Sequence, residues 1–448
     1  MKKRLLSILL SIIAIPAFAQ DHLSRYVDTG LANNQVLKEK NISLEQSMLL
    51  LKNAKSFFLP ALAFTSDYLS AQGGRSIGLP VGDLLNNVYS TLNQLTSTQK
   101  FAPVKNLNQQ FLPNNFYDAH FHISYPLLNT DLYYNKEISR QGVVMKEYEV
   151  DIFRQELIKE IKQAYFNYCS SRDAVSIYRN SLLLVNQNLK VNQSLLKNGK
   201  GLPANILRAQ SELQNVSSKI IEAENVRINS RNYLNFLINR PLIDSVIFEE
   251  HRMPDSLTGI LAGAPDTRNR SELKQINTGI EQSGTVIKLN QSYYIPKLST
   301  YLDLGSQASN FEYNTASRYY FFGAQLDIPI FSGGRNLNNI KQAQLDQSSL
   351  YLQKDFLTTQ LQLTATAARN NLLSALAVTS AEEKQLIAAK AYFNLIDKGF
   401  KEGSNSLIEF IDARDQLTDT SLKLNIDRYN ELIQLAEYER QTATSKVK

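Results

Sequence analysis

The chain has 448 residues and a formal net charge of +6, and three of its positive charges lie within the first four residues. A charge excess this small over such a length does not favour a nucleic-acid partner. The sequence contains 22 tyrosines and 20 phenylalanines but no tryptophan. Its one cysteine, Cys169, excludes an intrachain disulfide.

Residues 1–19 have the pattern of a secretory signal peptide. Three basic residues precede an apolar run from Leu5 to Ile15, and the tripeptide Ala17 to Ala19 supplies a small-residue cleavage site. The apolar run is too short to span a bilayer, and the rest of the chain has no uninterrupted apolar stretch of about 18 residues. We therefore expect a mature chain without a transmembrane helix. Because Gln20 and not a cysteine stands directly after the cleavage site, we expect no lipid anchor either.

Two strands are predicted in the first half of the chain. In FYDAHFHISYPLLN, apolar side chains alternate with polar ones, among them His120 and His122. A period of two is typical of a strand with one apolar face. The run FFLPALAFTSDY, around Pro60, follows a helical segment and predicts the other strand of the pair.

A long helix is predicted after these strands. Apolar residues recur at steps of three and four, or their sums, up to Leu196, which is the pattern of a coiled-coil seam. At about 1.5 Å per residue, such a helix extends roughly 100 Å, too far for a compact domain. After a break at Lys197 to Pro203, a second helix returns along the first, so the pair forms an antiparallel hairpin.

The same order of elements occurs twice, so the chain is interpreted as an internal duplication. Setting KNGKGLPANILRAQSEL on KEGSNSLIEFIDARDQL superposes Gly199 on Gly403 and Leu213 on Leu417, at an offset of 204 residues. A linker over 241–266 separates the two repeats. The first repeat, 20–240, has a helix, strands near 61–71 and 116–127, a long helix near 131–197 and a return helix near 203–238. The second repeat, 267–448, has a helix, strands near 297–307 and 318–330, a long helix near 337–398 and a return helix near 406–440.

Four strands per chain cannot close a barrel, and unpaired strand edges are costly next to lipid. Strands of about ten residues with alternating faces and aromatic belts are nevertheless typical of outer-membrane barrels. Three chains would supply twelve strands. The predicted fold is therefore a mixed α and β membrane protein that closes only as an oligomer.

Several motifs carry a resemblance to a known family. They are IPIFSGGRN at Ile328–Asn336, the helix-to-strand junctions FFLPAL and YYIPKL, NRSELKQI at Asn269–Ile276, and the paired G-x5-[NE]-[IFL]-[IL]-x-A-x3-L segments at the hairpin tips. Together and in this order, they make the chain resemble the TolC-type outer-membrane efflux proteins over essentially its whole mature length.

The resemblance implies a passive homotrimeric conduit in the outer membrane of a Gram-negative bacterium. A trimeric 12-stranded β-barrel would lie in outer-membrane lipid and continue as a long α-helical coiled-coil barrel in the periplasm. Such proteins dock on an inner-membrane pump of the RND or ABC type through a periplasmic adaptor (membrane fusion) protein. They export drugs, toxic solutes or proteins.

One segment departs from the symmetry of the two repeats. Pro60 and Pro126 lie 66 positions apart, whereas Pro296 and Pro329 lie only 33 apart, so the first strand pair has a long connection over 73–115. Its apolar content does not favour disorder. An ordered extracellular cap or plug and a plain surface elaboration both account for it.

Candidate functional residues gather at the hairpin tips. Glu409 and Asp412 are three apart on one helix face, which fits either a solvated helix start or a cation-selective periplasmic gate. The resemblance places an acidic constriction at these positions, although the first repeat has Asn205 where the second has Glu409. The remaining candidates are interpreted either as solvated surface and turn residues or as an adaptor contact: Lys197, Gly199, Lys200, Asn205, Lys401, Gly403 and Asn405.

A second set of candidates lies on the polar faces of the strands. His120 and His122, with Gln325 and Asp327, are interpreted as pore lining. A metal site at the two histidines lacks an evident third ligand, so no metal is expected.

Other signals are weak. Cys169 is interpreted as a small core residue, and Gly333-Gly334 as a strand-to-helix turn with positive φ, not a phosphate loop. No catalytic arrangement is evident, so neither enzymatic activity nor a cofactor is expected. The alternative function is a soluble periplasmic coiled-coil adaptor or structural spacer, which accounts less well for two hairpins that each follow a strand pair.

Overall fold

A computed structural model describes residues 22–253, 261 and 263–444 of the chain. The predicted signal peptide, residues 1–19, lies outside the described residues. The described chain divides into two compact units. Unit 1 contains the described parts of 22–47, 141–281 and 346–444, and unit 2 contains 48–140 and 282–345.

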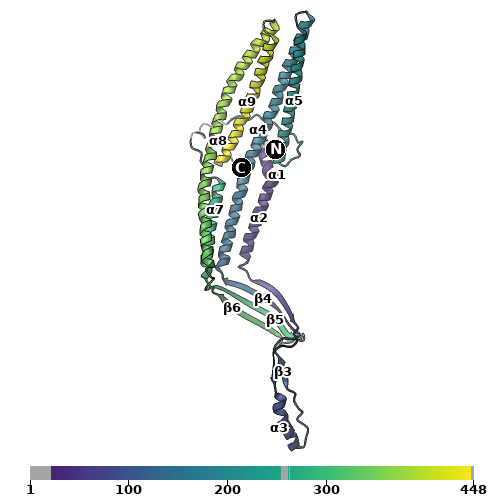
Figure 1. The fold of residues 1–448 in the computed structure, drawn as a ribbon, viewed down its shortest axis with the longest axis vertical. Coiled ribbons are helices and arrows are strands. Elements are labelled where there is room, and N and C mark those ends of the chain that lie inside the picture. The colour runs from purple at the N-terminus through teal and green to yellow at the C-terminus, as the bar shows by residue number, and fades with distance from the viewer. Residues whose placement is uncertain (1–21, 254–260, 262, 445–448) are drawn as a thin grey trace, which may run out of the picture. The chain divides into compact units, whose positions relative to one another are not determined.

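A four-stranded antiparallel sheet dominates unit 2, in the order β1-β4-β5-β6 (Figure 1). Each predicted strand pair supplies two neighbours, and β4 joins the pairs by lying next to β5. The predicted strand over 318–330 ends three residues early in the structure, at Asp327. The strands are β1 (Ala61–Leu69), β4 (Phe116–Leu128), β5 (Lys297–Ser309) and β6 (Arg318–Asp327).

The register of the sheet sorts its side chains onto two faces. Phe64, Phe121, Leu304 and Tyr320 pair across the four strands in one row, and the rows on either side of it belong to the other face. Neither face is covered within the described chain, because most residues of the four strands are at least partly exposed. On the apolar face, Tyr320 is 77% exposed.

The long connection between β1 and β4 is ordered. It contains β2 (Ser76–Leu79), α3 (Val81–Thr96) and β3 (Leu107–Gln110), and β2 pairs with β3 in a separate two-stranded sheet. The sequence predicted four strands per chain, so this second sheet is a correction. The amide of Asn86 bonds both the N–H and the C=O of Val104, at 2.8 and 3.0 Å, which fixes α3 against the returning chain.

Long helices make up most of the remaining chain. The strand-to-helix turn before α8 has positive φ at Gly333 and Gly334, as the sequence predicted. Helix α8 continues through Gly399 to Glu402, although a break was predicted from residue 399 onwards. The helices are α1 (His22–Asn33), α2 (Gln35–Ser56), α4 (Thr130–Lys197), α5 (Pro203–Leu237), α7 (Ser271–Gln291), the 3-10 helix η1 (Ser292–Tyr294), α8 (Arg335–Glu402) and α9 (Leu407–Thr442).

Corresponding features recur at an offset of about 204 residues. Helices α4 and α8 both have 68 residues. Arg179 of α4 bonds Glu224 of α5 at 2.7 Å, and in the second hairpin Glu383 of α8 bonds Arg428 of α9 at 2.8 Å. The two ion pairs occupy equivalent positions with the charges exchanged between the helices.

The main hydrophobic core of unit 1 lies where α1, α4 and the end of α5 meet. Leu157, Ile161 and Tyr165 of α4 are almost completely buried there with Leu234 of α5. Cys169 is fully buried in the same core, and burial raises the pKa of its thiol to about 12. A protonated, buried thiol confirms its interpretation as a small core residue. Among the described residues, no helix combines the length and the apolar character that crossing a membrane would require.

Candidate functional sites

Both hairpin tips end their first helix in the same way. The N–H of Gly199 bonds the carbonyl of Leu196, and that of Lys200 bonds the carbonyl of Leu195. The same two bonds recur from Gly403 and Ser404 to carbonyls of α8. This is the Schellman arrangement, and it places Gly199 and Gly403 at φ of +71 and +82°, where a side chain would be strained. The structure therefore gives both glycines a role in the turn itself.

Glu409 closes a capping box at the start of α9. Its carboxylate accepts the N–H of Ser406 at 2.6 Å, and the Ser406 hydroxyl accepts the N–H of Glu409 at 3.3 Å. The backbone bond from Ser406, followed by side-chain bonds from Ser406 and Asn405, lowers the pKa of Glu409. Asp412 is exposed on the next turn of the helix. The helix-start interpretation therefore accounts for Glu409, while Asp412 has no such role in the cap.

The first tip starts its return helix without a carboxylate. Leu202 occupies the N-cap position without a side-chain cap, and Pro203 takes the first helical position, where its missing N–H costs nothing. Asn205 stands at the position of Glu409, but no capping box forms there. Of the lysines at the tips, Lys401 pairs with Asp397 at 2.6 Å, and Lys197 and Lys200 are exposed.

A buried ion pair joins the two return helices near the tips. The Arg414 guanidinium of α9 is 1% exposed and donates to Glu212 of α5 at 3.0 Å. Arg208 approaches the other oxygen of Glu212 at 2.9 Å. Sequence reasoning missed this pair because its members lie about 200 residues apart and follow no periodic pattern.

The polar face of the sheet carries the predicted pore-lining residues. Nδ1 of His122 lies 2.5 Å from a carboxylate oxygen of Asp303, and Nδ1 of His120 lies 3.3 Å from one of Asp118. The Tyr319 hydroxyl also donates to Asp118, at 2.8 Å. These three contacts connect β4 to itself, to β5 and to β6.

Gly305 makes room for this arrangement. It lies between His120 and Tyr319 in the register, and a Cβ at Gly305 would meet the Cβ of His120 at only 2.5 Å. Gln325 and Asp327 lie further along the same face of β6, opposite Ser299 and Lys297. The structure therefore places all four predicted pore-lining residues on one face. Within the described ranges, no three His, Cys, Asp or Glu side chains gather closely enough to hold a metal ion.

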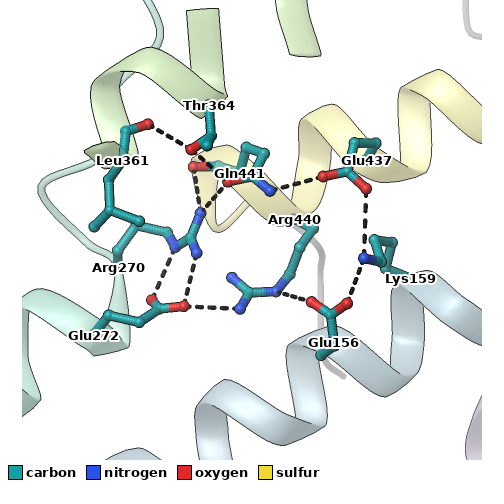
Figure 2. Close-up of polar contacts among 9 residues, drawn as sticks. All are labelled: Glu156, Lys159, Arg270, Glu272, Leu361, Thr364, Glu437, Arg440 and Gln441. Atoms are coloured by element: carbon teal, nitrogen blue, oxygen red, sulfur yellow. Dashed lines mark hydrogen bonds and ion pairs between the residues drawn. The ribbon is translucent and has the colours of Figure 1, made fainter. Parts of the chain in front are cut away.

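A network of ion pairs lies at the start of α7 (Figure 2). Arg270 donates to both carboxylate oxygens of Glu272, at 2.9 and 2.7 Å, and to the carbonyl and side-chain oxygens of Gln441, at 3.0 and 2.7 Å. Arg440 bridges Glu272, at 2.8 Å, and Glu156, at 3.1 Å. Both guanidinium groups are almost fully buried.

The network connects four helices of unit 1. Lys159 lies between Glu156 and Glu437, and the Thr364 hydroxyl of α8 donates to Gln441 at 3.2 Å. Burial opposes ionisation of Glu272, but hydrogen bonds from the two arginines outweigh it and hold the pKa at about 2. The family-like motif NRSELKQI thus supplies a buried arginine and the carboxylate that it shares with Arg440. The motif was visible in the sequence, but its partners on α4 and α9 were not.

Comparisons with known proteins point to one class of protein, the outer membrane efflux proteins. Residues 267–440 match the family model described as "Outer membrane efflux protein". The chain is similar to "Outer membrane protein TolC" of Vibrio cholerae serotype O1, with 21% identity over 303 residues that cover 65% of this chain and 68% of the relative. It is also similar to "Outer membrane protein TolC" of Escherichia coli K12, with 20% identity, 96% of this chain and 84% of the relative.

A solved structure has the same fold. The CmeC outer membrane channel of Campylobacter jejuni matches 94% of this chain and 85% of its own, with a TM-score of 0.73 and 16% identity. The chain is therefore similar to TolC-type outer membrane efflux proteins in sequence, and it shares the fold of the solved channel. The matched proteins are channel and efflux proteins, not enzymes.

Proposed function

We propose that three copies of the chain form a conduit for efflux through the outer membrane. Each four-stranded sheet supplies one third of a 12-stranded β-barrel, and the long helices of the two repeats supply a coiled-coil barrel in the periplasm. The observation that carries this proposal is the uncovered apolar face of the sheet. Phe322 and Leu62 are 68% and 67% exposed there, at the two ends of one row that also contains Ile123 and Leu302.

A soluble protein would have to cover such a face. Burying apolar area is worth about 25 cal/mol per Å², and large exposed apolar patches mark interaction sites. Lipid covers the face in the proposed barrel, while the open edges at β1 and β6 pair with the neighbouring copies. The alternative, a soluble periplasmic adaptor or spacer, leaves both the face and the edges without partners.

The helices support the same assembly. Several large apolar side chains on α5 and α8 are exposed in the single chain, among them Ile221, Leu352 and Ile387. Neighbouring copies cover these side chains when the helices of three chains surround one axis. The tip residues that remain accessible, including Lys197, Lys200, Lys401 and Asn405, contact a periplasmic adaptor that connects the conduit to an RND or ABC pump.

Glu409 and Asp412 form the narrow periplasmic entrance of the conduit. Three-fold symmetry brings six carboxylates around one axis, where like charges repel unless cations enter. The entrance is therefore cation-selective while it is closed, and it opens when the adaptor separates the helix pairs. The conduit itself is passive, so the pump sets which drugs, toxic solutes or proteins are exported.

The proposal is tested by detergent extraction of the outer-membrane fraction followed by reconstitution in planar bilayers. The expected result is a detergent-stable oligomer that produces discrete ion conductance. A soluble monomer without conductance would favour the adaptor or spacer alternative.

A further inference from the structure

The long connection between β1 and β4 contains a pocket between α3 and the segment that returns from it. The pocket has a volume of about 720 Å³, which is within the range of pockets that hold small ligands. One wall is the face of α3 that carries Asn86, Ser90 and Gln94, and the other wall is formed by residues 97–103. The whole pocket belongs to unit 2.

The amide side chains of two asparagines hold the walls of the pocket in place. The Asn93 amide nitrogen donates to the carbonyl of Phe101 at 2.8 Å, and its oxygen accepts the N–H of Phe101 at 3.1 Å. Asn86 makes the equivalent two bonds with Val104. Because positions seven apart lie on one face of a helix, two turns from each other, the returning segment is fixed at two points. The pocket is therefore formed in the free chain, and ligand binding does not have to order its walls.

The lining of the pocket is polar but uncharged. Among the described residues that form it, none carries a charge, and most have an amide or a hydroxyl group. The rings of Tyr89 and Phe101 lie together in the lining, with 5.6 Å between their centroids. Ser90, Gln94 and Gln99 are exposed, and their side chains form no hydrogen bond within the described chain. The pocket thus offers free amide and hydroxyl groups beside an aromatic pair.

This chemistry selects among classes of ligand. A charged ligand would lose its hydration without meeting an opposite charge, and a purely apolar ligand would leave the amides and hydroxyls without partners. The hydroxyl groups of a neutral sugar both donate and accept, as do the side-chain amides of Gln94 and Gln99. The apolar C–H face of a sugar ring can pack on the rings of Tyr89 and Phe101. We propose that this pocket binds a neutral saccharide.

The inference rests on the proposed conduit for one point only, which is that the connection between β1 and β4 faces the exterior of the cell. Neutral saccharides reach that side from two sources. One is the lipopolysaccharide of the cell's own outer membrane, and the other is free oligosaccharide in the medium. Both present the same hydroxyl-rich, uncharged chemistry, so the experiment has to distinguish them.

The test is binding of the purified full-length oligomer to an array of neutral, sulfated and sialylated oligosaccharides. The detergent must have no sugar headgroup, because such a headgroup would compete for the pocket. Binding is expected for neutral oligosaccharides only. Calorimetric titration of the oligosaccharides that bind then gives their dissociation constants for the wild type and for the variants.

Two variants remove the groups that are expected to contact the sugar. Gln94→Ala/Gln99→Ala should weaken binding by about ten-fold or more, because hydrogen bonds to the ligand are lost while the asparagine bridges stay intact. Phe101→Leu removes one ring but keeps the backbone bonds with Asn93, and it should weaken binding several-fold. The matched control is Gln109→Ala/Gln110→Ala, which removes two exposed amides of β3 outside the pocket and should leave the affinity unchanged.

Competition with lipopolysaccharide from the producing strain identifies the source. Displacement of the bound oligosaccharide would assign the ligand to the cell's own surface, and binding that lipopolysaccharide does not displace would assign it to soluble sugar. Equal binding of neutral and anionic oligosaccharides, or affinity that the glutamine variant and Phe101→Leu both retain, would overturn the inference. An oligomer that conducts ions but binds no neutral oligosaccharide would also overturn it, while leaving the proposed conduit intact.

Discussion

Glu272 is the carboxylate that two buried arginines share, so its removal takes an ion-pair partner from both. In Glu272→Gln, Arg270 and Arg440 lose their common anionic partner while remaining buried. Breaking a buried ion pair from one side costs about 3 to 5 kcal/mol. We expect a clear drop in the denaturation midpoint of the purified oligomer. Glu250→Gln is the control, because Glu250 pairs with Arg252 where both side chains are mostly exposed, and a change within about 0.5 kcal/mol is expected. An equal loss of stability in Glu272→Gln and Glu250→Gln would contradict a stabilising role of the buried network.

The same carboxylate predicts a pH dependence. Its pKa of about 2 lies below the ordinary value of 4.5, so the folded chain favours the ionised form. The resulting stabilisation is fully present above about pH 4.5 and is lost as the pH falls toward 2. The stability difference between wild type and Glu272→Gln should therefore shrink across this range. If the stability difference between wild type and Glu272→Gln stays constant down to pH 2, the variant is destabilised through packing alone.

The tip carboxylates can be tested without disturbing the start of α9. Glutamine also serves in a capping box, so Glu409→Gln combined with Asp412→Asn removes the charge but keeps the hydrogen bonds of Ser406. We expect normal assembly, lower cation selectivity and loss of block by multivalent cations added from the periplasmic side. Glu222→Gln changes an exposed carboxylate of α5 and should have no effect. Wild-type block in the double variant would leave Glu409 with its capping role only.

At the scale of elements, β6 offers a test of which face meets lipid. Leu326 and Gln325 are neighbours on opposite faces of this strand. A lysine at Leu326 should destabilise the folded barrel by about 2 to 4 kcal/mol if this position lies near the bilayer midplane. A lysine at Gln325 should be tolerated, because it faces the lumen in the proposed barrel. Comparable assembly of the two variants, judged by the yield of heat-resistant oligomer, would argue against this assignment of faces.

The insertion between β1 and β4 is the second element with a direct test. Deleting residues 73–112 removes β2, α3 and β3 together, so no strand is left unpaired. If the insertion caps or plugs the pore, the oligomer should still form and its single-channel conductance should rise. Unchanged conductance would indicate a surface elaboration.

The sequence predicted elements whose signals are periodic or local. The period of two located the strands, with ends that differ from the structure by at most three residues, as at Asp327. The Gly199 and Gly403 pair located the ends of both long helices. The short strands β2 and β3, with four residues each, carry too little pattern to be recognised.

Interactions between distant segments were not predictable in the same way. The Arg414–Glu212 pair and the network around Glu272 combine residues more than 100 positions apart. An arginine in a helix is ordinarily solvated, and only the packing of a third or fourth helix buries it. The sequence therefore indicated where the helices are, while the structure identified the charges that hold them together.

At the scale of the whole molecule, the account depends on the number of copies. One chain presents a sheet with two open edges and an uncovered apolar face. In the proposed trimer, neighbouring copies pair with the edges and lipid covers the face. Native mass spectrometry of the complex extracted from outer membranes in detergent tests this most directly. The account predicts a single species with three times the mass of the mature chain, stable against dilution. A monomer, or a complex with any other number of copies, would contradict it.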